Sequence, residues 1–128
     1  MILILTQCFP TRIGGIESLI SNLALSLSNR EKIIVLADQY DVINDALFDK
    51  ENKNKFLIQR IGGLKFFRKR KKIKKAKFLI KTKNIKFIIG DSWKSLELCV
   101  DYLNIKNIPS LCLAHGNELI SNKKGKIK

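Results

Sequence analysis

The sequence has few of the residues that build metal and disulfide sites. It contains a single histidine, His115, and three cysteines, Cys8, Cys99 and Cys112, with no metal-like spacing between any two. We therefore expect no metal site and no disulfide framework. Free cysteines in apolar surroundings behave as small buried side chains and suit a reducing compartment, so we expect a cytoplasmic protein.

Long apolar runs are also missing. No stretch approaches the about 18 apolar residues that a membrane-spanning helix needs. The N-terminal run ILIL has neither the length nor the basic leader of a signal peptide, so we expect any membrane contact to be peripheral. The 128 residues have the length of one domain. We predict that this domain covers residues 1–120 and is followed by a basic, frayed tail at 121–128.

Acidic residues are missing from one segment of the chain. Residues 65–86 contain 12 of the 25 Lys and Arg and no Asp or Glu, which leaves only +2 of the net charge of +14 for the rest. Such a cluster favours a polyanionic partner, either nucleic acid or an acidic membrane surface. A biased genome composition would explain the same excess of lysine, and the sequence leaves both explanations open.

Short aliphatic runs predict the strands, at residues 2–5, 32–37, 56–61, 85–89 and 109–114. Continuous apolar runs of this length are typical of strands buried on both faces of a parallel sheet. Between the first two runs, one helical face carries Ile16, Leu19, Ile20, Leu23, Ala24 and Leu27. A strand, a helix and a strand in this order predict a right-handed crossover. The pattern therefore predicts an α/β fold, a Rossmann-like open parallel sheet with helices on both faces.

Two more helices and one connection complete the predicted fold. A helix over residues 65–83 can pack on the sheet through one apolar stripe, which consists of Phe66, Ile73, Ala76 and Ile80. On its opposite side, among lysines, lie Phe67 and Phe78. A helix at 92–104 is expected to bury Leu96, Val100 and Leu103. The polar residues 38–55 are expected to form a surface connection, with room for a helical turn.

The carboxyl ends of the predicted strands form the expected ligand-binding edge, because the strand-to-helix loops converge there. Gly14 and Gly15 lie in the first of these loops, where a helix begins. Lacking side chains, they would leave unpaired N–H groups and the helix dipole open to an anion such as a diphosphate. The alternative is structural: Gly15 would allow close helix–sheet packing, and Gly14 a positive φ in a turn.

Three further candidates follow later strands at the same edge. His115 ends the last predicted strand. Because an unperturbed histidine has a pKa of about 6.5, this residue could exchange a proton or contact a sugar hydroxyl. A structural role is its alternative. Asp91 and Glu118 could bind sugar hydroxyls or bias this histidine, and Asp91 could equally cap the helix that follows it.

Two common nucleotide-binding motifs are absent from the first loop. The segment TRIGGIES contains neither the Walker pattern G-x-x-x-x-G-K-[ST] nor the dinucleotide pattern G-x-G-x-x-G. ATPases and NAD-dependent dehydrogenases are therefore disfavoured as function classes.

Three segments resemble, in the same order, the N-terminal domain of family 4 glycosyltransferases. CFPTRIGGIESLISNLALSLSNREKIIVLAD is similar to that family's glycine-containing loop, first helix and second strand. IIGDSWKSLE resembles an intermediate segment, and SLCLAHGNEL resembles a strand that ends in H-G-x-E. The likeness spans residues 2–119, and residues 38–83 match only in layout.

The resemblance implies one half of a GT-B fold and the retaining transfer of a sugar from a nucleotide-sugar donor, with no metal or other cofactor. Gly14 and Gly15 would approach the donor diphosphate, and His115 would contact the transferred sugar as a catalytic residue. This half would mainly bind the acceptor. The family's C-terminal half, which carries most of the nucleotide site, has no counterpart in these residues. We therefore expect a truncated or split gene, or a separately encoded partner half, and a chain that is incomplete as an enzyme.

The resemblance also suggests a role for the basic helix. Several members of the family act at the cytoplasmic membrane surface on lipid-linked or lipopolysaccharide acceptors, which implies an envelope polysaccharide or lipid-linked acceptor. The residues facing an anionic membrane would be Phe67, Lys69, Lys71, Lys72, Lys74, Lys75 and Phe78. The alternatives are a basic nucleic-acid-binding module and a non-catalytic interaction subunit. Against the first, the sequence has no helix-turn-helix or zinc signature.

Overall fold

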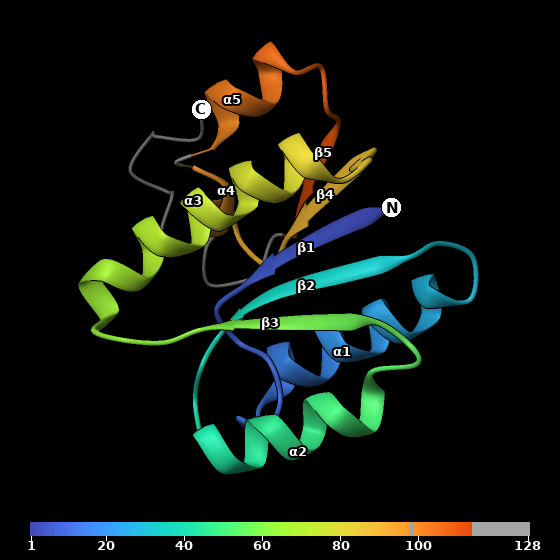
Figure 1. Ribbon diagram of the computed structural model, residues 1–128, viewed down its shortest axis with the longest axis vertical. Helices are drawn as coiled ribbons and strands as arrows, with labels where there is room; N and C mark the ends of the chain where they lie inside the picture. Colours follow the sequence, from blue (N-terminus) through green and yellow to red (C-terminus); the bar gives the residue numbers. More distant parts are fainter. Residues whose placement is uncertain (98, 114–128) are drawn as a thin grey trace.

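The computed structural model describes residues 1–97 and 99–113, which form one parallel sheet with helices packed around it (Figure 1). The strands are β1 (Ile2–Thr6), β2 (Ile33–Asp38), β3 (Leu57–Ile61), β4 (Phe87–Gly90) and β5 (Ser110–Cys112). They are ordered β3-β2-β1-β4-β5, and every neighbouring pair is parallel. The predicted α/β, Rossmann-like sheet is therefore confirmed.

The helices cover both faces of this sheet, as the sequence predicts. On one face lie α1 (Gly15–Ser28) and α2 (Val42–Asn52), and on the other lie α3 (Lys65–Thr82), α4 (Trp93–Leu96) and α5 (Val100–Ile105) (Figure 1). Within the part of the chain that the structure describes, no helix combines the length and the apolar character needed to cross a membrane.

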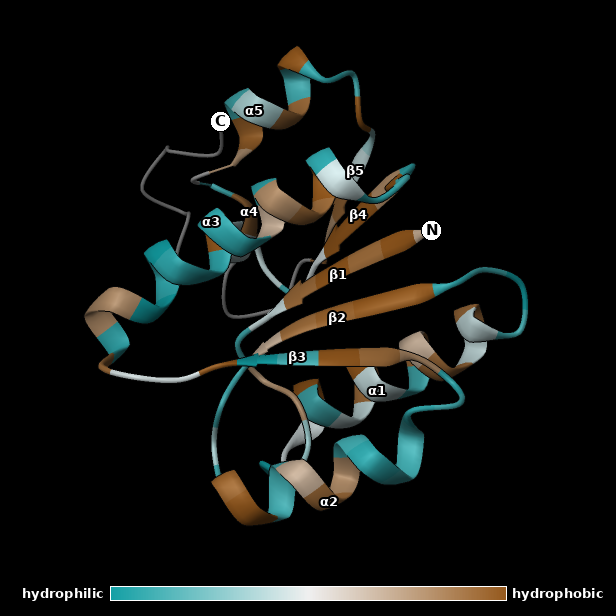
Figure 2. Cartoon of the chain, in the orientation of Figure 1, coloured by the Kyte–Doolittle hydropathy of each residue, from teal (hydrophilic) through white to brown (hydrophobic). Residues whose placement is uncertain are grey.

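The core divides into two apolar layers, because alternate residues of each strand point to opposite faces. Leu3 and Leu5 of β1 pack with Ile73 and Ala76 of α3. Ile2 and Ile4 of the same strand pack in the other layer with Ile20 and Ala24 of α1. β1 is buried along its whole length, and Figure 2 shows the central strands as continuous hydrophobic bands. Each fully buried aliphatic side chain contributes about 1.5–3 kcal/mol of transfer free energy.

One connection differs from the sequence-based expectation. Residues 38–55 do not form a mere surface connection, because they contain the 11-residue helix α2. The Asp41 side chain caps this helix by accepting a hydrogen bond from the backbone N–H of Asn44 at 3.1 Å. Few apolar side chains of α2 reach the core, and Phe48 is only partly buried. The periodicity that would reveal the helix is therefore weak.

The apolar stripe predicted for the basic helix is buried in the middle of α3, as expected, but it is exposed at the start of the helix. Ile73 and Ala76 are buried, but Phe66 is 71% exposed. The first turns of α3 project past the carboxyl ends of the strands, so no sheet lies beneath them (Figure 1). Phe67 and Phe78 are exposed, as expected for the opposite side.

The single helix predicted for residues 92–104 is also wrong. Two short helices, α4 and α5, lie there instead, with a break between Leu96 and Val100. Leu96 and Leu103 are buried as predicted, whereas Val100 is 40% exposed. Val100 is the first residue of α5, directly after this break.

Candidate functional site

The strand order reverses between β1 and β4, and this reversal defines the candidate site. The chain leaves β1 toward α1 on one face and leaves β4 toward α4 on the opposite face (Figure 1). Leu5 and Gly90 are paired in register near the carboxyl ends of the two strands. The loops that follow these strands therefore begin side by side, at the point where open parallel sheets bind their ligands.

Asp91 joins these two loops. It is 4% exposed, and its Oδ2 accepts hydrogen bonds from Thr6 Oγ1 at 2.7 Å and from the backbone N–H of Gln7 at 3.0 Å. Its Oδ1 accepts a hydrogen bond from the Ser95 hydroxyl. The N-cap of α4 is Ser92, whose side chain makes no capping hydrogen bond, so the prediction of Asp91 as the N-cap residue is wrong. The sugar-binding role stays a prediction.

The paired glycines lie at the start of α1, as predicted, but neither structural alternative for them is correct. Gly14 has a φ of 168°, an extended conformation that any residue adopts, so no positive φ is required. A Cβ built on Gly15 would meet no atom within 4 Å, so this glycine does not serve close helix–sheet packing. The first residue of α1 is therefore open to an approaching ligand.

A carboxylate that the sequence analysis missed lies beside these glycines. Glu17 is 5% exposed although it is charged, and its side chain folds back to the position that a Cβ on Gly14 would occupy. Its Oε1 forms an ion pair with Nε of Arg12 at 3.4 Å. A negative charge in the first turn is stabilised by the helix dipole. Glu17 follows the N-cap Gly14 by three residues, the position that glutamate takes in a capping box, and this spacing was the available signal.

The Cys8 thiol lies near the same carboxylate. Burial raises its pKa, Asp91 and Glu17 raise it further, and the Arg12 guanidinium opposes them. Cys8 therefore stays protonated near neutral pH, and a thiolate nucleophile is disfavoured at this position.

A second buried carboxylate holds the loop that leads to the glycines. Asp45 is 1% exposed, and its Oδ1 accepts hydrogen bonds from the backbone N–H and the hydroxyl of Thr11, at 3.2 and 2.9 Å. Its Oδ2 accepts from the backbone N–H groups of Tyr40 and Asp41, at 2.8 and 3.0 Å. Burial acts to raise the pKa of Asp45, but these hydrogen bonds outweigh it and lower the pKa below its usual value.

Arg60 completes this arrangement from the end of β3. Its guanidinium pairs with Asp49 at 2.8 Å, lies 3.7 Å from Asp45, and donates a hydrogen bond to the carbonyl of Pro10. It also stacks over the ring of Phe9, 5.4 Å from its centroid. The contacts of Asp45 with Thr11 and of Arg60 with Pro10 join residues 34 and 50 positions apart, so no local pattern indicated them. Together, Asp45 and Arg60 fix the chain immediately before the glycines.

Lys72 corrects the predicted membrane-facing set. It is 3% exposed, and its Nζ donates hydrogen bonds to Asp38 Oδ1 at 2.5 Å and to the Thr6 carbonyl at 3.1 Å. A buried, paired ammonium group cannot face a membrane, so this part of the prediction is wrong. Lys72 instead anchors α3 to the carboxyl ends of β1 and β2.

The remaining surface of α3 is both cationic and aromatic. Lys71 and Lys74 are exposed, and Lys69 pairs with Glu97. Arg70 stacks on Phe66 at 5.6 Å, and Lys75 on Phe78 at 5.1 Å. The largest exposed apolar side chains on and before this helix are Leu64, Phe66, Phe67 and Phe78. We call this surface the α3 surface.

His115 and Glu118 lie outside the described residues, so the predicted catalytic and sugar-binding roles there stay predictions. Comparison with models of known protein families finds no match to this sequence. Comparison with curated proteins finds no significant match either.

Proposed function

We propose that this chain is the acceptor-side half of a retaining glycosyltransferase, which transfers a sugar from a nucleotide-sugar donor to an envelope polysaccharide or lipid-linked acceptor. One observation carries the proposal: α1 begins with an uncovered glycine beside the reversal of strand order between β1 and β4. Exposed N–H groups at such a helix start are suited to a phosphate group. The sequence resemblance supplies the sugar chemistry.

The site residues divide the work in the following way. The amide of Gly15 approaches the donor diphosphate, and the half-exposed Arg12 supplies a cation beside it. Glu17 occupies the same helix end, so it competes with an anionic donor until Arg12 or a second protein unit compensates its charge. His115 contacts the transferred sugar, and Asp91 and Glu118 contact the sugar or the acceptor. A second α/β unit facing this edge supplies most of the nucleotide contacts and excludes water.

The α3 surface supports an acceptor held at a membrane. Lys72 anchors α3 to the ends of β1 and β2, so the α3 surface is fixed next to the edge where the glycines lie. Lysines near an anionic leaflet each contribute about 1 kcal/mol of binding, and exposed aromatic rings add to this. An acceptor carried by lipid would thus be presented close to the donor.

The test follows backbone amide shifts by NMR during titration with UDP, GDP, their sugars and inorganic pyrophosphate. We expect weak binding, with the largest shifts at Gly14, Gly15, Ile16 and Ser92. Shifts confined to other parts of the molecule, or none at millimolar ligand, would contradict the proposal.

The Gly15→Ala variant makes this test specific. Its new methyl group meets no protein atom, so the fold should be kept and, at a helical position, stabilised by about 0.5 kcal/mol. Binding should weaken severalfold, because the methyl group enters the space of the phosphate. Unchanged binding by a folded Gly15→Ala protein would place the ligand elsewhere.

A further inference from the structure

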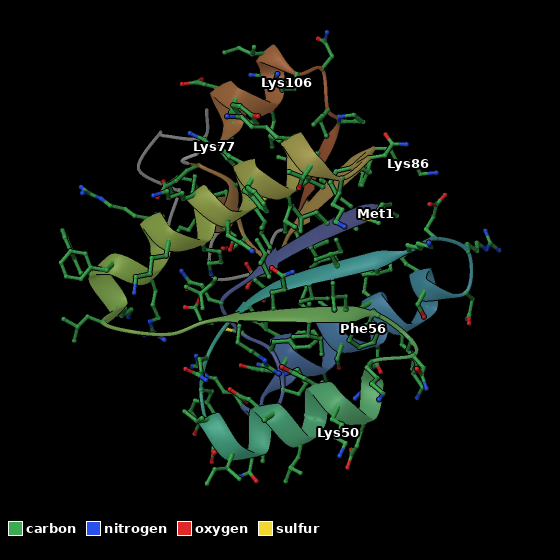
Figure 3. The ribbon with its side chains drawn as sticks, viewed as in Figure 1. Met1, Lys50, Phe56, Lys77, Lys86 and Lys106 are labelled. Carbon is green, nitrogen blue, oxygen red and sulfur yellow. The ribbon has the colours of Figure 1, made fainter. Side chains whose placement is uncertain are left out.

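A hollow lies at the amino ends of the strands, on the edge of the sheet opposite the candidate site. Its volume is about 260 Å³, and it is lined by Met1, Lys32, Ile33, Ile34, Lys53, Asn54, Lys55, Phe56, Leu57 and Lys83. Figure 3 shows Met1 and Phe56 at this edge, at the beginnings of β1 and β3. None of the residues discussed above as donor or sugar ligands lines this hollow.

Four lysines from three separate segments surround this hollow: Lys32 before β2, Lys53 and Lys55 between α2 and β3, and Lys83 after α3. All four are exposed, and no ion pair among residues 1–97 and 99–113 involves any of them. The lining contains no Asp or Glu. Four lysine residues therefore contribute to the wall of one small volume, and this wall holds no carboxylate.

The carboxylate that directly precedes Lys32 is already engaged. Glu31 precedes Lys32, and it pairs with the N-terminal amine at 3.3 Å and with Lys86. Hydrogen bonding to Lys86 is the main reason that the pKa of Glu31 lies below its usual value. Two other cations therefore already compensate the charge of Glu31.

The floor of the hollow is apolar. Ile33, Ile34 and Phe56 are buried beneath it, and Leu57 is 49% exposed at its side. An apolar floor with a few charged groups at the rim is the usual composition of a small-molecule site. The cationic rim disfavours a metal cation and favours an anionic group.

We propose that this amino-edge hollow binds a small phosphorylated molecule that carries an apolar or aromatic part. The phosphate groups lie between the lysines, and the apolar part packs on Leu57 and the floor. This site is independent of the proposed glycosyltransferase function, since it lies on the other edge of the sheet and shares no residue with the donor site.

Inorganic pyrophosphate and AMP are the probes, with backbone amide shifts measured by NMR at low ionic strength. Both ligands should shift the amides of Lys55, Phe56, Leu57 and Lys83. The Lys53→Gln/Lys55→Gln variant should weaken both ligands by at least about tenfold, since it removes two charge-assisted contacts. The matched control, Lys71→Gln/Lys74→Gln, removes the same charge from exposed positions outside the hollow and should leave binding unchanged.

A further variant tests the apolar part of the ligand. Leu57 is half exposed, so Leu57→Ser should fold, and it should weaken AMP binding while leaving pyrophosphate binding unaffected.

Equal weakening of binding by the two lysine double variants would overturn the proposal, because net charge alone would then explain binding. Shifts confined to the amides of Gly14 and Gly15 would overturn it too, while supporting the donor site. AMP binding that Leu57→Ser leaves unchanged would show a plain anion site and would also contradict the proposal.

Discussion

At the carboxyl edge of the sheet, Asp45, Asp91 and Lys72 are buried and held by several partners, whereas at the amino edge Lys32 and Lys55 stand exposed. The difference lies in what the charges do. A buried charge loses its hydration and is tolerated only when hydrogen bonds or an opposite charge replace the water, so each one fixes the chain around it. An exposed lysine costs little and orders nothing, but it remains available to a ligand. The buried charges at the carboxyl edge therefore hold the chain after β1, β2 and β4, and the amino edge has exposed cations.

The largest effect should come from removing the charge that holds the loop before the glycines. Asp45→Asn should lower the free energy of unfolding by about 3 kcal/mol, because it leaves Arg60 and several N–H donors poorly paired in a buried place. Urea unfolding at neutral pH measures the loss. Glu51→Gln, an exposed change on the same helix, should stay within about 0.5 kcal/mol. Similar values for the two would remove the distinction drawn between buried and exposed charges.

The same residue predicts how stability depends on pH. The pKa of Asp45 is lower in the folded than in the unfolded state, so its contribution is present above the unfolded value of about 3.9. It is lost as the pH falls through the folded pKa. Asp45→Asn should therefore flatten the acid limb of the stability curve. A variant with the same steepness as the parent protein below pH of about 4 would contradict this assignment.

Replacing either of two lysines of α3 should lower the free energy of unfolding by very different amounts. Lys72→Gln should cost about 2 kcal/mol of stability, since Asp38 and the Thr6 carbonyl lose their buried partner. Lys74→Gln, at an exposed position of the same helix, should cost less than about 0.5 kcal/mol. Thermal or urea unfolding of both variants makes the comparison, and an equal cost would mean that the Lys72 contacts contribute nothing.

Membrane binding should depend on the exposed lysines of α3, which contribute little to stability. Lys71→Gln/Lys74→Gln should weaken binding to vesicles containing phosphatidylserine by about 2 kcal/mol, or about 30-fold, and high salt should abolish binding by the parent protein. Arg30→Gln/Lys50→Gln removes equal charge from the α1 and α2 side and should have little effect. Equal weakening by both pairs would contradict a specific α3 surface. Tight, salt-dependent binding to duplex DNA without vesicle binding would favour the nucleic-acid alternative.

The smallest effect concerns the carboxylate at the start of α1. Glu17→Gln should lower stability by only about 0.3–1 kcal/mol, the contribution of a charge to the helix dipole. It should strengthen pyrophosphate binding at Gly14 and Gly15, because a competing negative charge is removed. NMR titration of the parent and variant proteins measures both sites at once, and the amino-edge hollow should be unaffected. Weaker binding by Glu17→Gln would mean that this carboxylate positions Arg12 for the ligand.

The sequence was sufficient for the parts of the fold that depend on local pattern. Continuous aliphatic runs identified the strands, and the spacing from Ile16 to Leu27 identified α1. It failed for α2, whose apolar face is thin, and for residues 92–104, where two short helices replace the single predicted one. In both cases either the contacts that place the helix are non-local, or the helix is too short for its apolar periodicity to be detected.

The site was predictable in place but not in detail. Gly14, Gly15 and Asp91 were expected at the carboxyl edge because the parallel fold brings strand ends together. The Asp45–Thr11 and Lys72–Thr6 contacts join residues 34 and 66 positions apart, and nothing in the local composition distinguishes Lys72 from its exposed neighbours. Which lysine is buried depends on which side of α3 faces the sheet. The sequence predicted this side only in part, since Phe66 was expected to pack on the sheet and is exposed.

The anchoring of α3 has a consequence for orientation. A helix of 18 residues is about 27 Å long, and its ammonium tether to the ends of two strands prevents it from swinging relative to the sheet. Any flat surface on which α3 rests would therefore set the tilt of the whole molecule and the height of the glycine-bearing rim above that surface. The helix would therefore fix the orientation of the molecule on that surface as well as its attachment.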